Sequence, residues 1–196
     1  MNLIELENEV ATLIKNKDIS KAIKITEREL SIISKTAFHD ILGRNLLHLK
    51  NELNLYLSKS YQASQKILHN ESKAMYCEMN GFTINYDLWF ILSFTFNFTN
   101  NLDDTDWIAD YDYFHEMALT ISGYEDIQQA YKDYMENERW DDQELESASE
   151  ICALLITLRL QELFKFTFDE FNLLEDWTKI PVFVTSHDYE SIYQTL

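Results

Sequence analysis

The residues whose types and spacing could do chemistry form one short acidic run. Asp103, Asp104, Asp106, Asp110 and Asp112 fall within ten consecutive positions. Hard cations such as Ca²⁺ and Mg²⁺ require several carboxylate oxygens that converge on one point. The run contains neither the turn-forming glycine nor the distal bidentate glutamate of an EF-hand loop. We therefore expect a solvated acidic loop here and no bound metal.

Other motifs with a known mechanism are missing from the sequence. Ser186, His187 and Asp188 have the residue types of a catalytic triad, but they are sequence neighbours. A triad is recruited from separate elements, so this adjacency gives no support. The chain has only three glycines, which nearly excludes a glycine-rich phosphate-binding loop. We expect a protein that is not an enzyme and that uses no cofactor.

The charge of the chain is distributed very unevenly. Residues 1–100 carry eleven Lys and Arg and eleven Asp and Glu, whereas residues 101–196 carry five and twenty-three. The second half therefore accounts for the whole formal charge of −18. Self-repulsion of this size destabilises a fold, and charge asymmetry concerns partners rather than architecture. An acidic surface retained against that cost indicates a basic partner.

Aromatic residues are interleaved with these acids. Tyr and Trp contribute a large share of the binding energy in many protein interfaces. Trp107, Tyr111 and Trp140 are the candidate anchors, although Trp107 and Phe114 also have the spacing of core residues. The predicted partner-binding residues are Asp103, Asp104, Asp106, Trp107, Asp110, Tyr111, Asp112, Glu136, Glu138, Trp140, Asp141 and Asp142.

Helical periodicity dominates the first seventy residues. We expect helices in this segment to form the scaffold that positions the acidic surface. Apolar residues recur at helical spacing over residues 3–14, and again from the cap at residues 18–20 to Ile33. A third stripe predicts one helix from Thr36 to Leu57, although Gly43 lies inside it. Further helices are predicted at residues 124–135 and 141–160.

The periodicity changes from helical to alternating near residue 73. Asn80 and Gly81 predict a two-residue hairpin, because both central positions of a type I′ turn need positive φ. The remaining predictions are strands at 74–79, 82–87, 88–98 and 119–122, a strand or frayed helix end at 164–169, and a last strand at 180–185. Pro181 makes this last segment an edge strand or places it at a strand start.

These elements predict an α+β fold in one domain that spans residues 1–196. N-terminal helices in residues 1–72 pack on a small, mostly antiparallel sheet, and residues 73–196 supply the sheet and the acidic helices. With 46% hydrophobic residues and abundant aromatics, the chain has the composition of a folded globular protein rather than a disordered one.

The sequence also favours a location in the cytoplasm. Its first ten residues lack the basic start and apolar run of a signal peptide. No apolar stretch approaches the roughly 20 residues that a membrane-spanning helix needs. Cys77 and Cys152 are far apart and are expected to be free, buried thiols. The charge of −18 repels nucleic-acid phosphates and anionic membranes, so we expect neither as a partner.

Together these features predict an acidic inhibitor that binds a basic protein. The expected kind is a bacterial immunity protein or antitoxin, whose carboxylates cover the active cleft of a basic, nuclease-type toxin. Two alternatives stay open. One is a small enzyme or metal-binding domain built on the loop from Asp103 to Asp112, and the other is an adaptor that binds a partner through its N-terminal helices.

Overall fold

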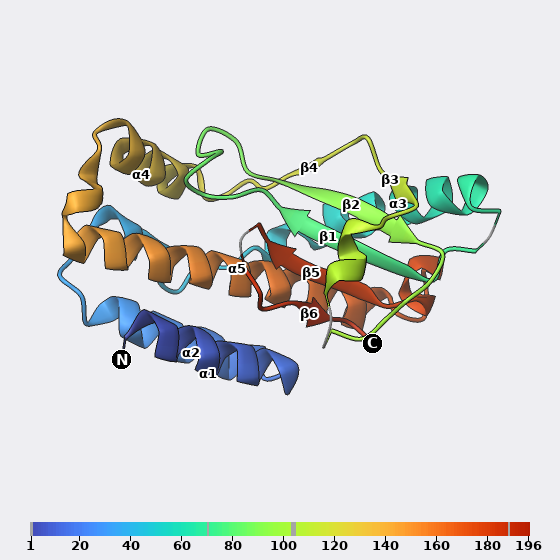
Figure 1. Cartoon of the computed structure of the whole chain (residues 1–196), viewed down its shortest axis with the longest axis horizontal. Helices are drawn as coiled ribbons and strands as arrows, with labels where there is room; N and C mark the ends of the chain where they lie inside the picture. The colour runs from blue at the N-terminus through green and yellow to red at the C-terminus, as the bar shows by residue number, and fades with distance from the viewer. Residues whose placement is uncertain (1, 70, 103–104, 188) are drawn as a thin grey trace.

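The computed structural model describes residues 2–69, 71–102, 105–187 and 189–196 (Figure 1). Five α-helices and six strands make up the described chain, with short 3₁₀ turns between them. The helices are α1 (Leu3–Lys15), α2 (Ile19–Ser31), α3 (Lys50–Ile67), α4 (Glu125–Glu136) and α5 (Gln143–Phe171). The strands are β1 (Ala74–Met79), β2 (Phe90–Phe96), β3 (Tyr113–Phe114), β4 (Leu119–Thr120), β5 (Val182–Ser186) and β6 (Tyr193–Gln194).

Helices α1 and α2 form where the periodicity predicts them. The Asn2 side chain accepts a hydrogen bond from the backbone N of Glu5, and the Glu5 carboxylate accepts one from the backbone N of Asn2, which is a capping box. Asp18 caps α2 by accepting from the backbone N of Lys21. Lys17 lies between them at φ 60° and turns the chain. The two helices therefore lie side by side (Figure 1).

The predicted helix from Thr36 to Leu57 is wrong in its first half. This segment contains two 3₁₀ turns, η1 (Ala37–Ile41) and η2 (Leu47–Leu49), and regular helix begins only at Lys50. Gly43 has φ +74°, a left-handed conformation that a helix does not contain. Its backbone N donates instead to the Glu27 carboxylate at 2.9 Å. The apolar residues of this segment are thus buried by a chain that turns at Gly43, and they do not form the face of a single helix.

The strands form one mixed sheet in the order β3-β2-β1-β5-β6, with β4 also paired to β2. Only the β1–β5 pair is parallel among the described pairings. The predicted α+β fold class with a mostly antiparallel sheet is therefore confirmed. Pro181 immediately precedes β5, as expected of a strand start, but β5 lies between β1 and β6 rather than at an edge.

The predicted hairpin at Asn80 and Gly81 is wrong. Met79 pairs with Ile91, so the connection from β1 to β2 spans ten residues, and the stretch 82–87 contains no strand. Gly81 does not have a positive φ, which a type I′ turn requires. Asn80 closes the longer loop through its side chain, which donates to the Leu88 carbonyl and accepts from the Phe90 backbone N.

Helix α5 is longer than predicted and is the central element of the fold. It continues through residues 164–169, where a strand or frayed end was an alternative. Its 29 residues correspond to about 44 Å of helix. It packs against the sheet through β5 and against α1 and α2 on another side (Figure 1). Residues 151–161 of α5 are all buried, as expected for a helix covered on several sides.

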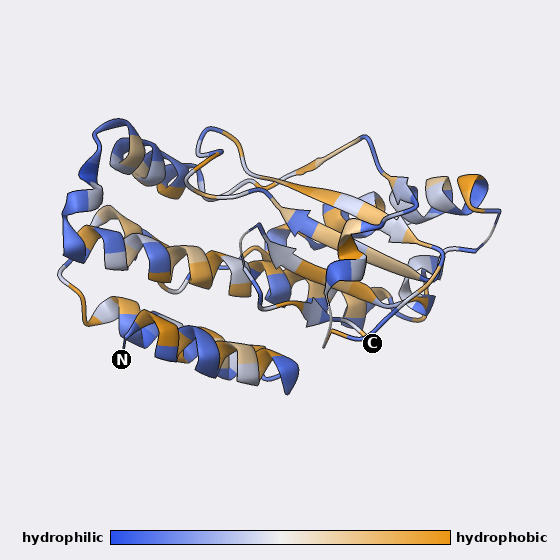
Figure 2. Cartoon of the chain, in the orientation of Figure 1, coloured by the Kyte–Doolittle hydropathy of each residue, from blue (hydrophilic) through white to orange (hydrophobic). Residues whose placement is uncertain are grey.

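Two hydrophobic clusters lie on opposite faces of the sheet. The larger one joins α1, α2, α3 and α5 to the inward residues of β1, such as Met75 and Cys77. The smaller one includes Tyr76, Phe96 and Phe183 on the outer face, together with Trp107. Figure 2 shows hydrophobic residues throughout the sheet and α5, while the turn between α4 and α5 is strongly hydrophilic.

Cys77 and Cys152 are free and buried, as predicted. Burial raises the pKa of each thiol to about 12, so both stay protonated at neutral pH. In the parts of the chain that the structure describes, no helix has the length and apolar character needed to cross a membrane.

Candidate protein-binding surface

The structure separates the predicted partner-binding residues into two groups. One group lies on η3 (Asp106–Ala109) and the residues after it, which run across the outer face of the sheet. The other lies at the turn between α4 and α5, at the far end of the long helix (Figure 1). Asp103 and Asp104 lie outside the described residues. The acidic half therefore presents two surfaces rather than the single face that we predicted.

Trp107 in the first group faces the core and not solvent. It is 7% exposed, and its ring centroid lies 4.9 Å from that of Phe96 and 5.3 Å from that of Phe183. Its indole Nε1 donates to the Asn101 carbonyl at 3.1 Å. The proposed anchor role of Trp107 therefore does not fit its position, because the indole attaches η3 to the sheet.

The other residues of this group remain accessible. Asp110 ends η3 and is exposed, and Asp112 accepts hydrogen bonds from the backbone and side chain of Asn97. Tyr111 is 48% exposed, with its ring 5.0 Å from that of Phe94. Of the two aromatic residues in this group, only Tyr111 can contact a partner directly.

The second group gathers at a sharp turn, which we call the end patch: Glu136, Glu138, Trp140, Asp141 and Asp142. Glu138 has φ 51° and reverses the chain after α4. Asp142 is the N-cap of α5 and accepts from the backbone N of Leu145 at 3.2 Å. Trp140 lies between them, is 44% exposed, and is the accessible aromatic residue of the end patch.

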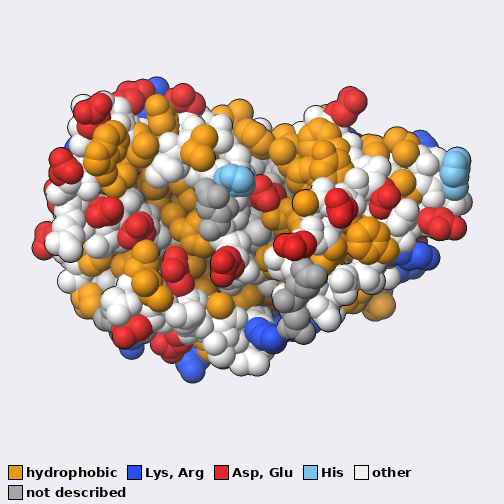
Figure 3. Space-filling model, viewed as in Figure 1, with side chains coloured by type: hydrophobic (Ala, Val, Ile, Leu, Met, Phe, Trp, Pro, Cys, Tyr) orange, Lys and Arg blue, Asp and Glu red, His pale blue; other side chains and the backbone are white. Residues whose placement is uncertain are grey.

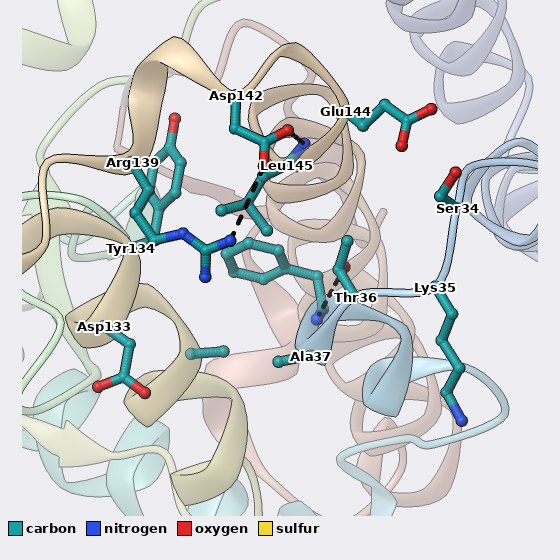
Figure 4. A pocket seen from close by; sticks show the side chains of 12 residues that line it. Ser34, Lys35, Thr36, Ala37, Asp133, Tyr134, Arg139, Asp142, Glu144 and Leu145 are labelled. Carbon is teal, nitrogen blue, oxygen red and sulfur yellow. Dashed lines mark hydrogen bonds and ion pairs between the residues drawn. The ribbon is translucent and has the colours of Figure 1, made fainter.

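A recess of about 300 Å³ opens beside the end patch. Figure 4 shows that Asp142 and Glu144 reach it from α5, Asp133 from α4, and Lys35 from the chain that follows α2. Apolar groups complete the lining, and Phe38, Tyr134 and Leu145 among them are buried. The recess thus combines an apolar lining with carboxylates, and the Arg139 side chain of the turn already reaches into it, 3.8 Å from Asp142. Such a lining suits a long basic side chain that has an aliphatic stem.

The cations of the acidic half are already paired within the molecule. Lys132 contacts Asp87 at 3.0 Å, Arg139 contacts Asp142 at 3.8 Å, and Arg159 contacts Glu27 and Glu162. Lys165 and Lys179 pair with Asp169 and Asp176. The stretch 133–150 contains eight Asp and Glu but only one base, Arg139. Among the described residues, only Glu136, whose carboxylate lies 3.8 Å from Lys132, and Asp142 form ion pairs out of these eight acids, so most of them have no internal counter-charge.

The pKa of Glu150 is raised, in part by this crowding of negative charge. Glu150 lies on the exposed side of α5, but partial desolvation by its neighbours is the main cause that raises its pKa, and the carboxylates of Glu146 and Glu7 raise it further. A cation brought to this end of the molecule would relieve part of that repulsion.

The residues that complete the recess were not predicted as site residues. Asp133 and Glu144 lie within the acidic stretch, so the local charge count was a signal that could have included them. Lys35 is about a hundred residues away in sequence, and only tertiary packing brings it here. Among the described residues, no group of three or more His, Cys, Asp or Glu side chains is arranged to hold a metal ion.

Comparisons with known proteins identify no relative: no protein family, no curated protein and no solved structure matches the chain. The site must therefore be interpreted from its own geometry and charge.

Proposed function

We propose that this protein is an acidic inhibitor, an immunity protein or antitoxin, that binds a basic toxin of the nuclease type and occludes its active cleft. The observation that supports this proposal is the excess of uncompensated carboxylates around the exposed Trp140 and the adjacent recess. In the complex, these carboxylates take the positions of the substrate phosphates. The place of action is the cytoplasm, where a toxin of this kind would otherwise act on nucleic acid.

The charge arrangement also has a kinetic consequence. Complementary charge steers two proteins together and raises the association rate, up to about 10⁸–10⁹ M⁻¹s⁻¹ at low salt. Exposed aromatic residues act differently, because they lengthen the lifetime of a complex that has already formed. The end patch therefore sets the association rate through its acids, and Trp140 sets the dissociation rate.

A matched pair of charge variants tests this proposal. The first replaces Glu136, Glu138, Asp141 and Asp142 of the end patch by Gln or Asn, and Asp142→Asn is used because Asn is an equally good helix N-cap. The control replaces four exposed acids elsewhere, Glu9, Glu52, Glu71 and Glu116, by Gln. Both variants lose the same charge, so they differ only in where that charge was removed.

Surface-plasmon resonance then measures binding to the basic toxin that the proposal requires, sought among the proteins encoded by neighbouring genes, at several salt concentrations. We expect association to slow strongly in the end-patch variant and only slightly in the control, and to slow further above about 0.15 M salt. Trp140→Ala should raise the dissociation rate. Equal association rates for the two variants, or an association rate independent of salt, would contradict the proposal.

A further inference from the structure

An open groove crosses the outer face of the sheet beside η3. Two adjoining cavities, of about 580 and 600 Å³, form it and share the lining residues Tyr76, Glu78, Thr105 and Ile108. Both volumes fall within the roughly 300–1,000 Å³ that is typical of ligand pockets. The end patch contributes no residue to this groove.

Glu78 lies at the centre of the groove and is held in a defined orientation. Tyr76 Oη donates to Glu78 Oε2 at 2.5 Å, and His187 Nδ1 lies 3.0 Å from Glu78 Oε1. The glutamate side chain is still 30% exposed. A carboxylate has about four acceptor positions, so these two contacts leave Glu78 able to accept hydrogen bonds from a ligand. Its neighbours orient it before any ligand arrives.

Aromatic rings line the groove next to this carboxylate. The Phe94 ring centroid lies 6.0 Å from that of Tyr76 and 5.0 Å from that of Tyr111. Tyr111 is half exposed and forms the outer part of this wall. Planar guanidinium groups stack on such ring faces, and a carboxylate within reach adds a charge-assisted hydrogen bond.

The groove carries negative charge without basic lining residues. Among the described residues around the two cavities, Glu78, Asp106 and Glu190 are acidic, and neither Lys nor Arg is present. Lys15 and Lys17 line a neighbouring cavity of about 390 Å³, beyond Leu102. Figure 3 likewise shows acidic side chains across this face, with Lys and Arg mainly toward its margins. The part of the groove that Glu78 and Tyr111 both line is therefore the part that attracts a cation.

We propose that this groove binds an arginine side chain of the basic partner, with the guanidinium paired to Glu78 and stacked on Tyr111. The proposal rests on the proposed function for the nature of the partner, but the groove itself is a separate site from the end patch. Arginine fits better than lysine, because its planar fork both stacks on a ring and hydrogen-bonds a carboxylate.

The test is an NMR titration of the isotope-labelled full chain with N-acetyl-arginine amide as the probe. We expect chemical-shift changes in backbone amides around Glu78, Ile108 and Tyr111. N-acetyl-citrulline amide has nearly the same shape without the charge and should cause little change. Glu78→Gln should weaken arginine binding about tenfold, as expected for loss of one charge-assisted hydrogen bond.

Three further variants make the result specific. Glu52→Gln removes the same charge at an exposed position of α3, away from both the groove and the end patch, and should bind the probe like the wild type. Tyr111→Ala should weaken binding while Tyr111→Phe keeps it, and because Tyr111 is half exposed this pair remains informative even if Glu78→Gln fails to fold. The proposal is overturned if citrulline binds equally well, if Glu78→Gln or Tyr111→Ala binds like the wild type, or if the shifts appear only at the end patch.

Failure of the arginine-binding proposal is distinguishable from failure of the proposed function. Loss of toxin binding in the end-patch variant, without arginine binding in the groove, would refute only the groove. Arginine binding in the groove, combined with equal toxin association in both four-acid variants, would instead refute the role of the end patch.

Discussion

Trp107 and Trp140 are both surrounded by acidic residues in the sequence, but the fold gives them different environments. Trp107 is 7% exposed and contacts Phe96 and Phe183, whereas Trp140 is 44% exposed on a 3₁₀ turn. The first indole therefore contributes to folding, and the second is available to a partner. A pair of alanine variants separates these two roles.

Trp107→Ala should lower the free energy of unfolding by about 3–5 kcal/mol, because it removes a large buried aromatic side chain and leaves a cavity. Trp140→Ala should change it by no more than about 0.5 kcal/mol, as is usual for an exposed position. Urea denaturation followed by far-UV circular dichroism measures both values without relying on tryptophan fluorescence. Similar losses in the two variants would show that the exposure of these indoles has been misassigned.

At the scale of elements, two glycines distinguish the loops of this fold. Gly123 precedes α4 with φ +93°, and a Cβ there would lie 2.9 Å from Cε1 of His48. Gly81 follows β1 without a positive φ, and a Cβ there would meet Cδ2 and Cβ of His187 at 3.7 and 3.9 Å, which are ordinary contacts. Only the first position requires glycine.

Gly123→Ala should therefore destabilise the protein by more than about 1 kcal/mol, from the left-handed backbone cost alone. Gly81→Ala should be neutral or stabilise it by up to about 1 kcal/mol, since alanine restricts the unfolded chain. Thermal or urea unfolding of the two variants tests this difference. A strongly destabilising Gly81→Ala would instead favour the tight type I′ hairpin that the sequence predicts.

At the scale of the whole molecule, the excess negative charge opposes folding. Glu150 has a raised pKa, mainly through partial desolvation, so the folded state binds its proton more tightly than the unfolded state does. Asp126 and Glu125 have lowered pKa values, because Arg44 pairs with the first and the backbone N of Gly123 donates to the second. As pH falls, protonation of Glu150 therefore stabilises the folded state, whereas protonation of Asp126 and Glu125 destabilises it.

Stability should consequently gain from the protonation of Glu150 as pH falls toward the ordinary carboxyl range, and it should lose from the protonation of His115, whose pKa is lowered by burial. It should fall below about pH 4, where Asp126 and Glu125 are protonated and their stabilising contacts are lost. Added salt should raise the melting temperature at pH 7, because it screens the repulsion between carboxylates. The Debye length shortens from about 30 Å at 0.01 M salt to about 8 Å at 0.15 M.

Thermal melts across pH and salt measure both effects. Glu150→Gln should remove the gain that Glu150 contributes below neutral pH, whereas Glu116→Gln, at an exposed position, should reduce general repulsion without removing the pH dependence. A Glu150→Gln variant whose melting temperature follows the same pH profile as the wild type would contradict this account.

The amino-acid sequence by itself determined the local elements and the acidic character of the second half. Helical periodicity defines α1, α2 and α4, side-chain caps mark the starts of α1 and α2, and alternation defines β1, because these signals depend on residues a few positions apart. The charge asymmetry is likewise a property of composition. The α+β class follows from the order of these elements.

Only the tertiary structure decided how the loops run and which acidic residues share a surface. The turn at Gly43, the long connection after Asn80 and the parallel pairing of β1 with β5 depend on contacts between residues far apart in sequence. The same long-range packing buries Trp107 on the sheet and divides the predicted acidic face between η3 and the end patch. Neither periodicity nor composition carries that information, because side chains distant in sequence become neighbours only when the core forms.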